Sequence, residues 1–78
     1  MSRKQLARRR IRSRHFPGLQ VVFYEDQHTD GRRLYSSEID ISAGDRIVID
    51  GQSPEEVEEK TSATLQVALL VRRSSALH

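Results

Sequence analysis

The strongest constraint on the fold is a helix start at Ser53-Pro54-Glu55-Glu56. Ser53 can accept hydrogen bonds from the backbone amides of the first turn, and Glu56, three residues later, can reach back to the amide of Ser53. Pro54 suits the first helical position, because its missing N–H would be unpaired there in any case. A helix therefore begins at Pro54, and the rest of the fold has to supply a surface for it to cover.

The end of this helix is less sharply defined by the sequence. At 100° per residue, one narrow apolar stripe contains Val57, Thr61, Thr64, Ala68 and Val71. This periodicity predicts a single helix that continues to about Arg72. Residues 64–71 would also suit a strand, because a short apolar segment fits both structures. We predict the long helix and keep the strand as the alternative.

Three segments that precede the helix are rich in β-branched or aromatic residues and alternate in polarity: 19–24, 34–41 and 46–50. Asp30-Gly31 is a strong turn signal between the first two. Consecutive strands with short connections pair most simply as an antiparallel meander. The predicted fold class is therefore α+β, with a three-stranded antiparallel β-meander followed by one C-terminal helix in a single domain over residues 16–73.

The charge is divided sharply along the chain. Seven of the thirteen basic residues and none of the eleven acidic residues lie in the first fourteen positions. That segment has a formal charge of +7, whereas the rest of the chain has −5. It also has few apolar side chains to offset the entropy of ordering. We predict a flexible arginine-rich arm over residues 1–15, disordered in the free protein, and a disordered tail over residues 74–78.

The arm is the main candidate for a function. Arginine binds phosphate oxygens through two parallel hydrogen bonds, and arginine-rich segments that fold on RNA are a known mode of recognition. A solvated tail and an organellar targeting peptide are the alternatives. We predict non-catalytic nucleic-acid binding, in association with RNA, through the phosphate backbone. The candidate contact residues are Arg3, Lys4, Arg8, Arg9, Arg10, Arg12 and Arg14.

The second candidate is a protein-interaction or regulatory module. Its surfaces would be the acidic body and the hydrophobic helix, and an acidic protein surface is the alternative partner of the arm. If residues 64–71 are helical, the apolar surface extends around more than half of the helix, which is more than one sheet can cover. We therefore expect a homodimer, with an interface at Leu65, Leu69 and Leu70.

The sequence offers no catalytic constellation. There is no cysteine, and His15, His28 and His78 lie far apart, without a partner at metal-ligand spacing. Tyr24 and Tyr35 could stack on bases, but their acidic neighbours would repel phosphates, so core packing or an exposed hairpin tyrosine is the better interpretation. We predict no enzyme activity, no metal site and no cofactor.

The longest uninterrupted apolar segment, residues 67–71, is too short to cross a bilayer. From this and from the absence of a secretory signal pattern we expect no membrane contact and a cytoplasmic protein.

Overall fold

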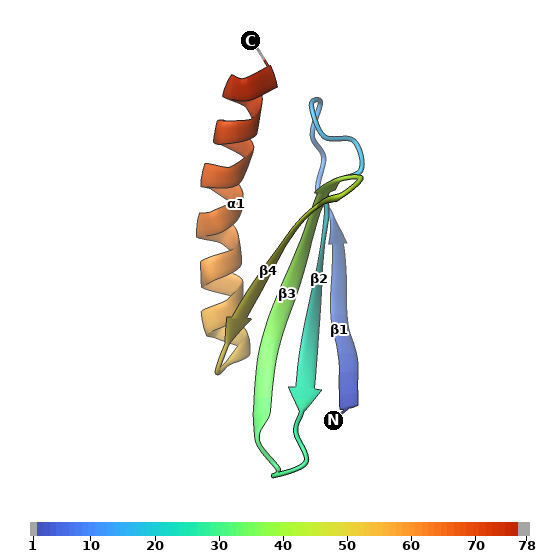
Figure 1. Ribbon diagram of the computed structural model, residues 1–78, viewed down its shortest axis with the longest axis vertical. Helices are drawn as coiled ribbons and strands as arrows, with labels where there is room; N and C mark the ends of the chain where they lie inside the picture. The colour runs from blue at the N-terminus through green and yellow to red at the C-terminus, as the bar shows by residue number, and fades with distance from the viewer. Residues whose placement is uncertain (1, 77–78) are drawn as a thin grey trace.

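The structure is a computed structural model that describes residues 2–76 of the chain. Four strands are followed by one helix: β1 (Ser2–Arg10), β2 (Gln20–Gln27), β3 (Arg33–Ser42), β4 (Asp45–Gly51) and α1 (Pro54–Ala76). The strands form one antiparallel sheet in the order β1-β2-β3-β4, which is the order of the sequence. The α+β class, the meander and the C-terminal helix are therefore confirmed (Figure 1).

The helix lies along one face of the sheet, over β3 and β4. Apolar side chains that alternate along the strands point toward it and form a small core, because a half-buried strand places every second residue inside. The core residues are Leu19, Val21, Ile39, Ile41, Ile49 and Ala68. The other face of the sheet carries no helix, and the molecule is long and narrow, with extents of 48 × 18 × 18 Å.

The helix start has the expected chemistry. Ser53 Oγ accepts a hydrogen bond from the amide of Glu56 at 3.1 Å. The Glu56 carboxylate accepts one from the amide of Gln52 at 2.7 Å, one residue earlier than a standard capping box would have it. The hydrogen bond from that amide is the main cause that lowers the pKa of Glu56, and a hydrogen bond from Lys60 lowers it further.

The turns at Gly31 and Gly44 have φ values of 88° and 76°, which glycine adopts without strain.

The sheet has four strands, so the expectation of three strands with a disordered arm is wrong for residues 2–10. These residues form β1, which pairs with β2 from Ser2↔Gln27 to Arg10↔Gln20 and has a register shift between Gln5 and Ala7. Residues 11–15 belong to the connection from β1 to β2. Residues 2–10 are ordered because side chains of β1 bind acidic and aromatic groups of the neighbouring strands and of the helix.

The ambiguous segment 64–71 is helical. The helix continues to Ala76, beyond the boundary expected at residue 73, so residues 74–76 of the expected tail are helical. Residues 77–78 of that tail lie outside the described residues.

Candidate functional site

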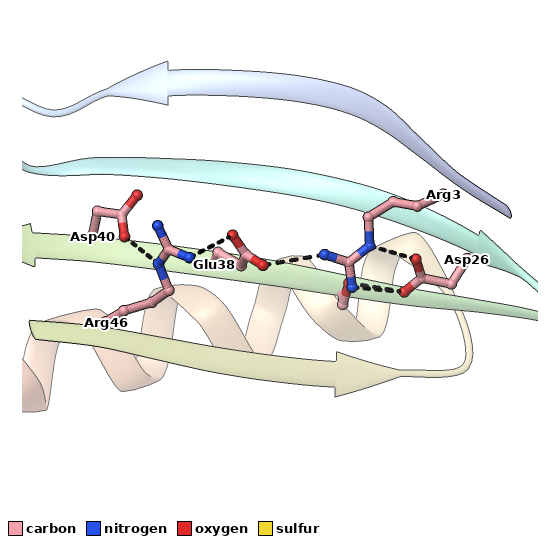
Figure 2. Close-up of polar contacts among 6 residues, drawn as sticks. Arg3, Asp26, Glu38, Asp40 and Arg46 are labelled. Carbon is pink, nitrogen blue, oxygen red and sulfur yellow. Dashed lines mark hydrogen bonds and ion pairs between the residues drawn. The ribbon is translucent and has the colours of Figure 1, made fainter. Parts of the chain in front are cut away.

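Arg3 belongs to a chain of ion pairs across the helix-free face of the sheet, with Glu38 at its centre. The Nε of Arg3 is 2.7 Å from Asp26 Oδ1, and its Nη1 is 3.2 Å from Glu38 Oε2. Glu38 is also paired with Arg46 at 3.5 Å, and Arg46 Nε lies 2.6 Å from Asp40 Oδ1. Figure 2 shows these five side chains following one another over β1 to β4. Arg3 therefore stabilises the sheet, and its charge is already compensated.

The chain of ion pairs also affects the ionisation of Asp40 and Arg3. The hydrogen bond from Arg46 is the main cause that lowers the pKa of Asp40, and Gln20 and the charge of Arg8 lower it further. The hydrogen bond to Asp26 likewise raises the pKa of Arg3 above its ordinary value. Asp40 is thus held ionised. Arg8 forms no ion pair among the described residues, but its charge acts on Asp40.

Arg9 is bound on the opposite face of β1. Its Nη1 lies 3.0 Å from Glu58 Oε1 of α1, and its guanidinium stands 5.1 Å from the centre of the Phe23 ring. The guanidinium of Arg3 covers Tyr24 in the same way, at 4.5 Å. Both arrangements are cation–π contacts. They occupy the faces of the two aromatic rings on β2 that could have stacked on bases.

Five of the seven predicted contact residues form no ion pair within residues 2–74, whose side chains the structure describes: Lys4, Arg8, Arg10, Arg12 and Arg14. Arg10, Arg12 and Arg14 are exposed and close together in sequence, at the end of β1 and in the connection to β2. The fold therefore divides the predicted set into two arginines used for internal contacts and a group that remains available.

A cleft of about 700 Å³ lies between this connection and the last turns of α1. Its cationic side chains are Arg12, Arg14 and Arg73, and its apolar ones are Phe16, Leu69 and Leu70. The remaining lining residues are Ser13, His15 and Gln66, so none of them is acidic. We call this feature the arginine cleft. The two segments that line it, the β1–β2 connection and the last turns of α1, lie at the same end of the molecule, opposite the β2–β3 hairpin (Figure 1).

A second hollow, of about 420 Å³, adjoins the arginine cleft. It is lined by Arg10, Ile11, Arg12, Ser13, Pro17 and Leu19, and it shares Arg12 and Ser13 with the cleft. The exposed cations therefore continue from Arg10 through Arg12 and Arg14 to Arg73. Two further cleft residues, Leu69 and Leu70, were predicted from the sequence as parts of a dimer interface and not of this site. Phe16 and Arg73 were not candidates, because they come together only once the helix packs on the sheet.

The predicted interface residues are separated by the fold. Leu65 and Leu69 pack against the core as half-buried side chains, whereas Leu70 is 66% exposed. Val67 and Val71, which sequence reasoning did not single out as interface residues, are 66% and 57% exposed. Spacings of three and four residues place these three side chains on one face of α1.

Among the described residues there is no group of three or more histidines and acids arranged to hold a metal ion. No helix in the described part of the chain is both long and apolar enough to cross a membrane.

No family model, curated protein or solved structure matches this chain. Its function is therefore to be inferred from its own residues and their arrangement.

Proposed function

We propose that this protein binds nucleic acid without catalysis, in association with RNA, and that its contacts are to phosphates at the end of the molecule that carries the arginine cleft. The observation that supports this is a group of exposed arginines that form no ion pair among the residues whose side chains the structure describes, namely Arg10, Arg12, Arg14 and Arg73. No acid occurs among the residues that line the cleft or the adjoining hollow. Arginine is the side chain best suited to binding a phosphate with two hydrogen bonds.

The charge balance at this end favours an anion. The carboxyl end of a helix carries about −0.5 of an elementary charge, which would oppose a phosphate. Arg72 already offsets part of it, because its Nη1 donates to the carbonyl of Ala68 at 3.1 Å while its Nε is bound to Asp45. The four exposed arginines named above carry more positive charge than the negative charge that remains at the helix end. Their binding to phosphates would release the counterions around the nucleic acid.

The salt dependence gives this proposal a magnitude. If Arg10, Arg12, Arg14 and Arg73 each neutralise one phosphate, the slope of log affinity against log salt is about −3 for single strands and about −4 for duplex DNA. If all seven cations of the first fourteen residues contacted phosphates, the slope would be steeper. We do not expect this, because Arg3 and Arg9 are already paired with acids of the same chain.

The experiment is a titration of labelled RNA and DNA with two charge-matched variants. Arg12→Gln/Arg14→Gln removes two cations from the cleft, and we expect at least a tenfold loss of affinity and a slope less steep by about 1.5. Arg32→Gln/Arg33→Gln removes the same charge from the hairpin at the other end, where both residues are paired with acids, and we expect little change. Equal losses in both variants, or no binding by the wild type at low salt, would refute the proposal.

A second candidate is self-association through α1. Val67, Leu70 and Val71 form an exposed apolar face, which a second copy of the same face would cover. We expect sedimentation to show a dimer at micromolar concentration that Leu70→Glu dissociates, since an unpaired carboxylate would be buried. Val48→Glu on β4, where the wild-type side chain is 55% exposed, is the control and should leave the dimer intact. A monomeric wild type at high concentration would eliminate this candidate.

A further inference from the structure

The arginine cleft combines two kinds of surface that a simple polyanion site does not need together. Cations at Arg12, Arg14 and Arg73 stand beside the apolar side chains of Phe16, Leu69 and Leu70. A phosphate requires only the first kind. The second kind suits a flat, weakly hydrated group such as a nucleobase.

Phe16 is held in place within this cleft by its own backbone. Its amide donates to Ser13 Oγ at 3.2 Å, and its carbonyl accepts from the amide of Leu19 at 3.1 Å. The amide of Ile11 donates to the carbonyl of Leu19, which closes the connection at its base. The ring is half-buried, and the His15 ring lies beside it at 6.4 Å with an angle of 60°. The side chain also packs against the hydrophobic core, so the ring is positioned before any ligand arrives.

Phe16 also differs from the aromatic rings of β2. Phe23 and Tyr24 each have an arginine over the ring, supplied by Arg9 and Arg3. No such contact covers Phe16 among the described residues. It is therefore the aromatic side chain at the cationic end that has no arginine over its ring.

We propose that the arginine cleft takes up an unpaired base against Phe16, while the neighbouring arginines bind the flanking phosphates, so that the preferred ligand is single-stranded nucleic acid. This inference rests on the proposed function. A volume of about 700 Å³ lies in the range of small-ligand sites, and a base within a duplex is stacked and cannot enter it.

The adjoining hollow favours a strand of nucleic acid over a free nucleotide as the ligand. Because the hollow shares Arg12 and Ser13 with the cleft, the row of cations extends to Arg10, which does not line the cleft itself. A strand can place successive phosphates along this row, whereas a mononucleotide uses only the part beside its base.

The test compares single-stranded and duplex oligonucleotides of equal length, in RNA and DNA, by fluorescence anisotropy with the full chain. We expect tighter binding of the single strands. Phe16→Leu keeps an apolar side chain against the core but removes the aromatic face, and it should weaken single-strand binding about five- to hundredfold, with the salt slope unchanged. Phe16→Tyr should retain the affinity. Phe23→Leu, which removes a ring already covered by Arg9, is the matched control and should retain the single-strand preference.

The outcomes separate this inference from the proposed function. The inference would be overturned by equal affinity for single strands and duplexes, together with a Phe16→Leu variant that melts like the wild type and binds single strands as tightly. Phosphate binding would then remain as proposed. Adenosine monophosphate competing as well as an oligonucleotide at equal nucleotide concentration would overturn the preference for a strand. No binding of any nucleic acid at low salt would overturn the proposed function itself.

Discussion

At the scale of single residues, one buried hydrogen bond joins the helix to the sheet. Ser37 of β3 and Thr61 of α1 are almost fully buried, and their hydroxyl oxygens lie 2.7 Å apart. The Thr61 hydroxyl donates to the carbonyl of Val57, so its single proton is used there. Ser37 is therefore the donor of the bond between the two side chains. Ser37 needs Thr61 as the acceptor for its proton, whereas Thr61 donates its own proton elsewhere.

This asymmetry predicts unequal effects of mutation. Thr61→Val leaves the Ser37 hydroxyl buried without a partner, and we expect a loss of about 1 to 3 kcal/mol in the free energy of unfolding. Ser37→Ala should cost less, because Thr61 keeps its bond to Val57. The double variant should be more stable than Thr61→Val alone, since no buried hydroxyl is then unsatisfied. Urea denaturation of the four proteins measures these differences, and a larger cost for Ser37→Ala would contradict the assignment of the donor.

At the scale of elements, Arg72 ties the far end of α1 to the start of β4. Its Nε and Nη2 lie 2.6 and 2.8 Å from the two carboxylate oxygens of Asp45, a two-pronged ion pair. The hydrogen bond from Arg72 lowers the pKa of Asp45. A carboxylate with a lowered pKa stabilises the fold above its ordinary pKa, and this contribution is lost as the pH falls through the folded-state value.

A dependence on pH follows. Asp45→Asn should melt below the wild type at pH 7, and the difference in Tm should shrink as the pH falls below about 4, the ordinary pKa of aspartate. Melting curves between pH 7 and pH 2 measure it. Glu59→Gln, an exposed position on α1, serves as the control and should follow the wild type throughout. A difference in Tm that stays constant over this range would show that the Asp45 charge does not act through Arg72.

The strands and the helix could be predicted from the sequence wherever local chemistry decides them. Ser53 and Pro54 start α1 as expected, and Asp30-Gly31 forms the turn between β2 and β3. β1 could not be predicted in this way, since its residues neither alternate in polarity nor favour a strand. The one signal was the opposite charge of the two parts of the chain, which attract each other as well as a ligand. The cleft also escaped prediction, because distant residues form it.

At the scale of the whole molecule, the side-chain contacts that hold β1 are mainly ionic, in addition to its backbone pairing with β2. Its exposed side chains contribute little to the core, whereas Arg3 and Arg9 link it to β2, β3 and α1. Surface ion pairs contribute little singly and are weakened by salt, so the attachment should be sensitive to ionic strength. β1 is thus the strand whose pairing depends most on solution conditions.

Hydrogen exchange tests this attachment. We expect the β1 amides that pair with β2 to be protected at low salt and to lose protection in about 1 M salt, while those of β3 change little. Arg3→Gln should lower the protection of β1, whereas Arg32→Gln, which removes a pair within the hairpin, should not. Exchange of β1 at the rate of an unstructured peptide in the wild type would mean that residues 2–10 are a free arm after all.

The position of β1 at the edge of the sheet has a colloidal consequence. The outer backbone groups of an edge strand can template the addition of another strand, and positive side chains along it keep two such edges apart. If nucleic acid binds as proposed and also neutralises Lys4, Arg8 and Arg10, it would remove that repulsion. Binding of the polyanion would then favour edge-to-edge association of two copies through β1.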